Sequence, residues 1–287
     1  MPELPEIETI RRGLSGLIVS KTIKSEMHDT AKSFPNAPAD VAQFLLGATI
    51  TTIRRRAKVL MIDLSSGYSL VVHLKMTGQL VYRGEQNFGA GHPNDSLVGK
   101  LPDKSTRVTL AFAGDGHLYF NDQRKFGWMK LLPTIEIPNI DFMKKVGPEP
   151  LEAAFTPEQF AERFKRRAKT NIKAALLDQT VVAGVGNIYA DESLWEAKIS
   201  PKRLVATLSA TDFEHLYTGL RNVMNLSIEK GGSTDRNYLN AEGAKGQYLD
   251  HASVFRKEGT PCPRCGTIIV KIRHAGRGTH FCPNCQV

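Results

Sequence analysis

The last 26 residues of this 287-residue chain hold all four of its cysteines, as two Cys-x-x-Cys pairs. Cys262 and Cys265 form the first pair, Cys282 and Cys285 form the second, and 16 residues separate the pairs. This spacing is typical of a zinc ribbon in which four thiolates surround one ion. Four protein ligands leave no open coordination position, so the sequence predicts one structural Zn²⁺. A redox-active dithiol is the alternative interpretation.

The charge balance favours a polyanionic partner, because 38 Lys and Arg residues outnumber 29 Asp and Glu residues. The segment between the cysteine pairs suits a nucleic-acid backbone, since it carries Lys271, Arg273, His274, Arg277 and His280. Alternatively, the zinc only fastens the end of the chain. No apolar run is long enough to cross a membrane and no signal peptide precedes the first helix, so we expect a cytoplasmic protein.

The first eight residues combine a helix start with a reactive terminus. Removal of Met1 would expose the secondary amine of Pro2, which can condense with an aldehyde-level carbon to give an iminium. An α-amino group has a reference pKa of about 8, so part of it is unprotonated near neutrality. Glu3 is the nearest proton donor. The alternative is that Pro and Glu simply begin a helix, whose apolar stripe would be Ile7, Ile10 and Leu14.

Periodicity predicts a β domain followed by a helical one. Residues 48–132 contain apolar strand-like runs at 59–62, 70–72, 108–112 and 118–120, with a hairpin turn at 114–116 and a surface loop at 82–106. Helices are expected at 157–167, 172–177, 188–197 and 210–230, followed by a flexible loop over 231–252. The predicted division is therefore a domain over 1–135, a proline-rich linker over 136–150, a helical domain over 151–235, and a loop with the cysteine module over 236–287.

A glycine-rich turn at 184–187 precedes one of these helices. Its glycines allow close backbone approach to a ligand, the helix start favours an anion, and Asn187 adds a side-chain donor. An ordinary tight turn between helices is the alternative. The turn lacks the Lys-Ser/Thr of a phosphate-binding loop, which excludes a nucleotide hydrolase of that type.

Six motifs in order give the chain a close resemblance to a known family. They are Pro2-Glu3-Leu4-Pro5-Glu6, His73-Leu74-Lys75-Met76-Thr77-Gly78, Asp122-Gln123-Arg124-Lys125-Phe126-Gly127, Gly147-Pro148-Glu149-Pro150-Leu151, Gly184-Val185-Gly186-Asn187-Ile188-Tyr189, and the four-cysteine finger. The chain resembles the formamidopyrimidine-DNA glycosylases, which are bacterial base-excision repair enzymes, over essentially its whole length. The resemblance implies an α+β fold: an N-terminal helix with a two-layer β-sandwich, then a helical domain with a helix–two-turn–helix and a zinc finger. Damaged double-stranded DNA would cross the cleft between the two domains of a monomeric enzyme.

The same resemblance implies the chemistry. Pro2 would attack C1′ of the damaged nucleoside and expel the base, Glu3 would supply the proton that opens the sugar, and Glu6 would be a further active-site carboxylate. Elimination on both sides of the iminium would then cut the strand, which makes the protein a glycosylase and a lyase. Lys58 and Arg277, together with Asn187 and His73, match residues that bind phosphates around the lesion. Otherwise the arginine run beside Lys58 is only a solvated turn.

A base must leave the duplex before it can be attacked, and this leaves a hole in the stack. Met76, Arg124 and Phe126 match the family residues that fill the hole. From the residue types alone, Met76 and Phe126 are interpreted as core residues.

Two departures from the family pattern leave roles unassigned. Ser105-Thr106-Arg107 replaces a His-containing stretch of many relatives, and Asp235 and Asn237 differ from the common residues of the loop that covers the extruded base. The expected substrates are oxidised purines, namely 8-oxoguanine and formamidopyrimidines, because Leu4 is typical of that branch. The alternatives are an oxidised-pyrimidine glycosylase similar to endonuclease VIII and a zinc-ribbon DNA-binding protein without catalysis.

Overall fold

The computed structural model describes residues 2–233 and 247–287 of the chain. These residues form two compact units. The first contains 2–144 with 230–233 and 247, and the second contains 145–229 and 248–287. Among the helices in these ranges, none is both long enough and apolar enough to cross a membrane.

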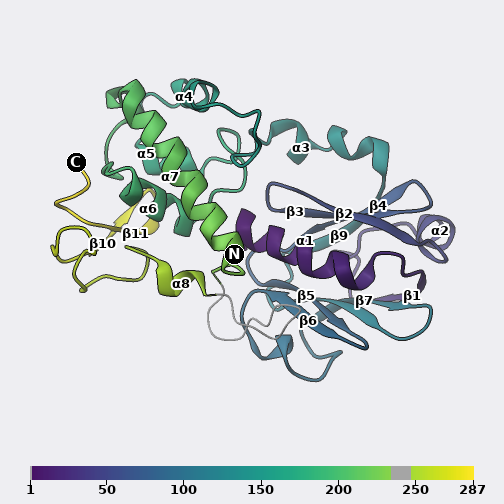
Figure 1. Cartoon of the computed structure of the whole chain (residues 1–287). Coiled ribbons are helices and arrows are strands. Elements are labelled where there is room, and N and C mark those ends of the chain that lie inside the picture. Colours follow the sequence, from purple (N-terminus) through teal and green to yellow (C-terminus); the bar gives the residue numbers. More distant parts are fainter. Residues whose placement is uncertain (1, 234–246) are drawn as a thin grey trace. The chain divides into compact units, whose positions relative to one another are not determined.

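The first unit begins with helix α1 (Leu4–Ile18), which starts where the sequence predicts it. Pro5 lies in its first turn, and the expected stripe of Ile7, Ile10 and Leu14 is fully buried. Burial of each such side chain contributes about 1.5–3 kcal/mol. The helix packs against strands β2 and β3 of one sheet and β5 and β6 of another (Figure 1). This packing fixes the start of the chain on the sheets.

Two antiparallel sheets form the body of this unit. The four-stranded sheet has the order β2-β3-β4-β9 and the five-stranded sheet has the order β1-β7-β8-β5-β6. Apolar side chains from both sheets share one core with α1, which confirms the expected β-sandwich. The strands are β1 (Ile23–His28), β2 (Ile50–Arg56), β3 (Val59–Leu64), β4 (Tyr68–His73), β5 (Gly78–Arg83), β6 (Asn87–Gly91), β7 (Thr106–Phe112), β8 (His117–Asp122) and β9 (Trp128–Pro133). Short helical segments accompany them: α2 (Pro38–Asp40), η1 (Val41–Leu45), η2 (Asp95–Leu97), η3 (Thr134–Asn139) and α3 (Asp141–Lys145).

The predicted surface loop over 82–106 is wrong in part, because strand β6 and segment η2 lie within it. Glycines give β6 a low strand propensity, which is why the sequence pattern misses it. Its Phe88 and Ala90 are nevertheless buried and β6 pairs with β5. A Cβ on Gly13 of α1 would lie 2.3 Å from the Phe88 ring, so this strand and the helix need a glycine to approach each other.

The second unit is helical, as predicted. Its helices are α4 (Pro157–Lys165), α5 (Ile172–Leu177), α6 (Asn187–Glu196) and α7 (Ala210–Glu229), with the short segments η4 (Val205–Thr207) and α8 (Tyr248–His251). The four predicted helices are confirmed within two residues at each end. Phe160 and Phe164 of α4 are buried with Phe213 of α7, and the Phe164 and Phe213 ring centroids lie 5.5 Å apart. Strands β10 (Val270–His274) and β11 (Arg277–Phe281) complete the unit as a hairpin (Figure 1).

The predicted loop over 231–252 is wrong at its end, because α8 occupies Tyr248–His251. Tyr248 is fully buried, and its ring centroid lies 5.5 Å from that of Tyr189 on α6. A single helical turn is too short to leave a periodicity that can be detected in the sequence. Asp235 and Asn237 lie outside the described residues.

Candidate functional site

Pro2 is buried directly in front of α1, and Glu3 is the N-cap residue of that helix. The two acids of the opening motif form a capping box. The Glu3 side chain accepts from the Glu6 backbone N–H, and Glu6 Oε2 accepts from the Glu3 N–H at 2.9 Å. These reciprocal bonds satisfy two amides of the first turn. The capping box between Glu3 and Glu6 therefore holds the start of the chain in place.

Glu6 also reaches a distant part of the chain. Its Oε1 accepts from the backbone N–H of Ser233 at 2.9 Å and from the Ser233 hydroxyl at 2.7 Å. Gly232 lies against it in a left-handed conformation with φ +92°, and a Cβ there would sit 3.5 Å from Glu6 Cγ. Both oxygens of Glu6 are thus engaged in hydrogen bonds, which makes it a structural partner of Glu3.

Lys58 and His73 lie close together on the four-stranded sheet. Lys58 is a buried residue of the tight β2–β3 turn, and His73 ends β4 opposite Val59. Burial lowers the pKa of His73 to about 3, with smaller contributions from the charges of Lys75 and Lys58. The imidazole is therefore neutral near neutrality. His73 Nδ1 accepts from the Lys75 backbone N–H at 3.1 Å, which leaves the proton on Nε2 as a donor.

Met76 and Phe126 are not core residues. Met76 is 37% exposed on the β4–β5 loop, and Phe126 is 46% exposed on the β8–β9 loop. The Arg124 guanidinium lies 4.9 Å from the centre of the Phe126 ring, and Lys32 approaches the same ring at 5.3 Å. The interpretation of Met76 and Phe126 as packing residues is therefore wrong. A thioether, a guanidinium and an aromatic ring instead stand on two surface loops.

The glycine-rich turn leads directly into α6. Gly184 has φ +80°, and Gly186 is the N-cap residue. The Gln179 side chain accepts from the Gly184 N–H and donates to the Val185 carbonyl. Asn187 Nδ2 donates to the carbonyl of Gly278 at 3.0 Å. One amide hydrogen of Asn187 thus fixes the hairpin beside Arg277. Within residues 2–233 and 247–287 the second amide hydrogen has no acceptor, so it can donate to a ligand.

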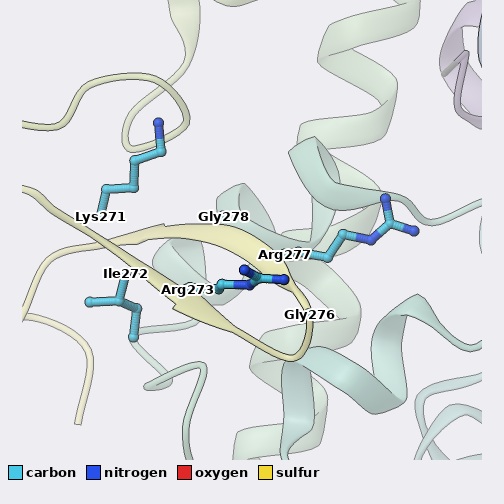
Figure 2. A pocket seen from close by; sticks show the side chains of 6 residues that line it. All are labelled: Lys271, Ile272, Arg273, Gly276, Arg277 and Gly278. Atoms are coloured by element: carbon cyan, nitrogen blue, oxygen red, sulfur yellow. The ribbon is translucent and has the colours of Figure 1, made fainter.

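The β10–β11 hairpin presents most of its basic residues around a surface groove of about 410 Å³. Figure 2 shows Arg277 extending from the end of the hairpin beside Gly276, with Arg273 and Lys271 also lining the groove. His280 departs from the predicted basic surface because it is buried. Its Nδ1 lies 3.0 Å from Asp191 Oδ2, and its backbone N–H donates to the same oxygen.

The four cysteines converge as predicted. Their Sγ atoms all lie within 4.8 Å of one another, with 3.9 Å between Cys262 and Cys285 and 3.5 Å between Cys265 and Cys282. A tetrahedron with metal–sulfur bonds of about 2.3 Å has edges of about 3.8 Å, so the cluster fits one Zn²⁺. The Trp195 Nε1–H donates to Cys262 Sγ at 3.4 Å, which ties the site to α6. This zinc would supply stability, because the four thiolates fill its coordination.

A buried charge network in the second unit has no counterpart in the sequence analysis. Lys173 of α5 and Asp191 of α6 are both fully buried and form an ion pair at 2.6 Å. Lys173 Nζ also donates to Thr279 Oγ1 at 2.7 Å and to the Gly278 carbonyl at 3.1 Å. The network anchors β11, which carries Arg277. The only sign of this network in the sequence is Lys173 itself, a charged residue within the otherwise apolar run of α5.

Asp122 and Thr77 lie within two of the motifs, but nothing in the residue pattern marks either one as a functional residue. The structure thus joins Glu3 with Glu6, Lys58 with His73, and Arg124 with Phe126 in the first unit. In the second unit it joins Asn187 with the hairpin of Arg277.

Comparisons with known proteins agree along the whole chain. Residues 1–129 match the formamidopyrimidine-DNA glycosylase N-terminal domain, residues 146–238 match the H2TH domain of the same enzymes, and residues 259–287 match the zinc finger found in FPG and IleRS. The formamidopyrimidine-DNA glycosylase of Carboxydothermus hydrogenoformans is 41% identical, with all of both chains covered. That of Streptococcus mutans is 40% identical, with 100% of this chain and 99% of the relative covered.

Solved structures similar to this chain belong to the same enzymes. The Lactococcus lactis Fpg (MutM) in complex with DNA containing N7-benzyl-Fapy-dG is 36% identical with a TM-score of 0.86, and 99% of each chain is covered. A MutM complex with DNA containing carbocyclic 8-oxo-G is 36% identical with a TM-score of 0.85, again over 99% of each chain. The chain therefore belongs to the formamidopyrimidine-DNA glycosylase family.

Proposed function

We propose that this chain is a bifunctional DNA glycosylase and AP lyase that excises oxidised purines, 8-oxoguanine and formamidopyrimidines, in base excision repair. Relatives with this name match along the full chain, and similar solved structures hold DNA with Fapy-dG or 8-oxo-G lesions. The observation that carries the proposal in this molecule is the pinned terminus. Pro2 directly precedes a helix whose N-cap is Glu3, so the amine and the carboxyl group belong to neighbouring residues at a fixed helix start.

The proposed reaction follows from the nucleophilicity of a secondary amine. The Pro2 nitrogen forms a bond to C1′ while the N-glycosidic bond breaks, and the base leaves with the proton that the amine nitrogen gives up. Glu3 gives a proton to the ring oxygen as the C1′–O bond opens, which leaves an iminium on Pro2. The iminium acidifies the neighbouring C–H bonds, so the 3′ phosphate and then the 5′ phosphate leave by β- and δ-elimination. Hydrolysis of the remaining iminium frees Pro2.

The remaining predicted residues receive roles that suit their settings. We assign Lys58, Arg277, Asn187 and the neutral Nε2–H of His73 to phosphate contacts. Met76, Arg124 and Phe126 fill the hole left by the extruded base, and their exposure on two loops supports this role. Cys262, Cys265, Cys282 and Cys285 hold one structural zinc. We also propose a monomeric enzyme that resides in the bacterial cytoplasm and associates with the nucleoid through DNA.

Excision assays test the proposed substrate. Duplexes containing 8-oxoguanine opposite cytosine should be cut with phosphates at both ends of the gap, and duplexes with an oxidised pyrimidine should be cut far more slowly. Faster cleavage of the oxidised pyrimidine would support the endonuclease VIII-like alternative. Binding of the lesion duplex without any base release would support the zinc-ribbon binding protein instead.

A further inference from the structure

Two loops cross between the two sheets at the same end of the first unit. The loop over 74–77 leaves β4 of the four-stranded sheet and enters β5 of the five-stranded sheet. The loop over 123–127 leaves β8 of the five-stranded sheet and enters β9 of the four-stranded sheet. Gly78 pairs with Asp122 and His73 pairs with Trp128, so the loops lie side by side at both ends. Met76 stands on one loop, and Arg124 and Phe126 stand on the other.

The fully buried carboxyl group of Asp122 joins these loops. Its Oδ2 accepts from the backbone N–H groups of Phe126 at 2.8 Å and Gly127 at 2.7 Å. Its Oδ1 accepts from the hydroxyl of Thr77 and from the Arg124 N–H at 3.2 Å. The Arg124 N–H also points to Thr77 Oγ1 at 3.1 Å. Asp122 therefore holds the backbone of the 123–127 loop, and the Thr77 hydroxyl ties the 74–77 loop to both the Asp122 carboxyl group and the Arg124 N–H.

Residues Ser105 and Arg107 hold the backbone of Asp122. Both belong to the Ser105-Thr106-Arg107 segment that departs from the family pattern. The Asp122 N–H donates to the Ser105 carbonyl at 2.7 Å, and Arg107 Nε donates to the Asp122 carbonyl at 2.8 Å. Arg107 is itself buried and forms an ion pair with Asp29. This support leaves Asp122 little freedom to move away from the loops.

The close fit of the loops also limits their independent movement. A Cβ on Gly127 would lie 2.9 Å from the His73 carbonyl oxygen and 3.2 Å from Asp122 Oδ2. Lys75 and Lys125 adopt left-handed backbone conformations, with φ of 51° and 56°. The two loops are thus one structural piece with three exposed side chains at its surface.

We infer that Asp122 and Thr77 are a positioning pair that locks the two loops together, so that Met76, Arg124 and Phe126 enter the base stack as one rigid wedge. This inference rests on the proposed function. Neither residue touches the reacting atoms in this role. Loss of the pair should therefore slow the step that needs a filled stack and spare the chemistry at Pro2.

Thr77→Val and Asp122→Asn test the pair, because each keeps the shape of its side chain and removes part of the hydrogen-bonding between the loops. Each should slow excision of 8-oxoguanine from duplex DNA by about tenfold, the effect of losing one or two buried hydrogen bonds to a charged group. Cleavage of a single-stranded oligonucleotide with a preformed abasic site should stay within about twofold of the parent rate, because no stack has to be filled. Thr77→Ser should restore duplex excision.

Ser69→Ala is the matched control, since Ser69 is a buried hydroxyl of the same unit bonded to Asp63 and Thr134, and it lies near the start of β4, at the opposite end of that strand from the 74–77 loop. It should excise at the parent rate. Combining Thr77→Val with Arg124→Ala should give a smaller loss than the product of the single effects, because both act on one wedge.

Parent-like duplex excision by both variants would overturn the inference, and so would an equal loss on single-stranded and duplex substrates. A parent protein that releases no 8-oxoguanine at all would instead contradict the proposed function. If Asp122→Asn does not fold, as judged by its thermal unfolding, the Thr77→Val and Thr77→Ser comparison still decides the matter.

Discussion

Glu3 and Glu6, the two acids of the opening motif, have different hydrogen-bonding roles in the folded chain. Both oxygens of Glu6 are bonded to backbone or hydroxyl donors of Glu3 and Ser233, whereas Glu3 caps the helix beside the nucleophile. The sequence predicts the helix start because Pro5 and the apolar spacing determine it locally. It does not predict the Ser233 contact, because no local pattern links residues 227 positions apart.

Glu3→Gln should reduce base excision by about 100-fold or more, because the amide keeps the size of the side chain but donates no acidic proton. Binding of a lesion duplex, measured by fluorescence anisotropy, should stay close to that of the parent. Glu162→Gln is a suitable control, since that side chain is 65% exposed on α4. Full excision activity of Glu3→Gln would remove Glu3 from its assigned role.

His73 should make the first unit sensitive to acid. Its folded-state pKa of about 3 lies below the ordinary value of 6.5, so below pH 6.5 the unfolded chain takes up a proton that the folded chain does not. Stability therefore falls as the pH falls from 6.5 towards 3, by up to about 1.4 kcal/mol per pH unit. Urea unfolding of His73→Gln between pH 7 and 4.5 should show a shallower fall than the parent. Identical slopes would mean that the imidazole is not kept neutral, and exposed His117 is the control position.

At the scale of elements, the helices and the apolar strands followed from periodicity, while the glycine-rich strand β6 did not. Phe88 of β6 is held by β5 and by the space that Gly13 leaves on α1, and neither neighbour is visible in the local sequence. The burial of His280 could not be predicted for the same reason. In the sequence it is one of several basic residues, whereas in the fold its ring is bonded to Asp191. Local patterns predict which segments form elements, and packing decides which side chains those elements expose.

The finger hairpin should contribute one phosphate contact through Arg277. Arg277→Gln should reduce the slope of log affinity against log salt by about one unit, with similar weakening on all DNA sequences. Arg264→Gln removes a charge from the same module, but Arg264 lies 4.0 Å from the centre of the Trp195 ring and donates to the Trp195 carbonyl. The salt dependence of DNA binding by Arg264→Gln should therefore match that of the parent protein. An unchanged slope in Arg277→Gln would place this arginine away from the DNA backbone.

At the scale of the whole molecule, the predicted site residues are divided between the two units. Eight of them, from Pro2 to Phe126, belong to the sheet unit, whereas Asn187, Arg277 and the cysteines belong to the helical unit. The spacing of the cysteines alone predicted the zinc ligands, because it depends on short segments. The first eight residues alone left a reactive terminus and a plain helix start both open. The roles of Met76, Arg124 and Phe126 came only from the family resemblance, since a loop residue carries no periodic signal of its function.

The central claim is that the terminal amine of Pro2 is the nucleophile. Borohydride reduction during reaction with an abasic-site duplex, followed by mass spectrometry of tryptic peptides, tests it most directly. The account predicts that the trapped sugar is on the peptide from Pro2 to Arg11, with Met1 removed, and that the yield falls sharply in Pro2→Gly. A trapped sugar on an internal lysine such as Lys58, with Pro2 unmodified, would contradict it.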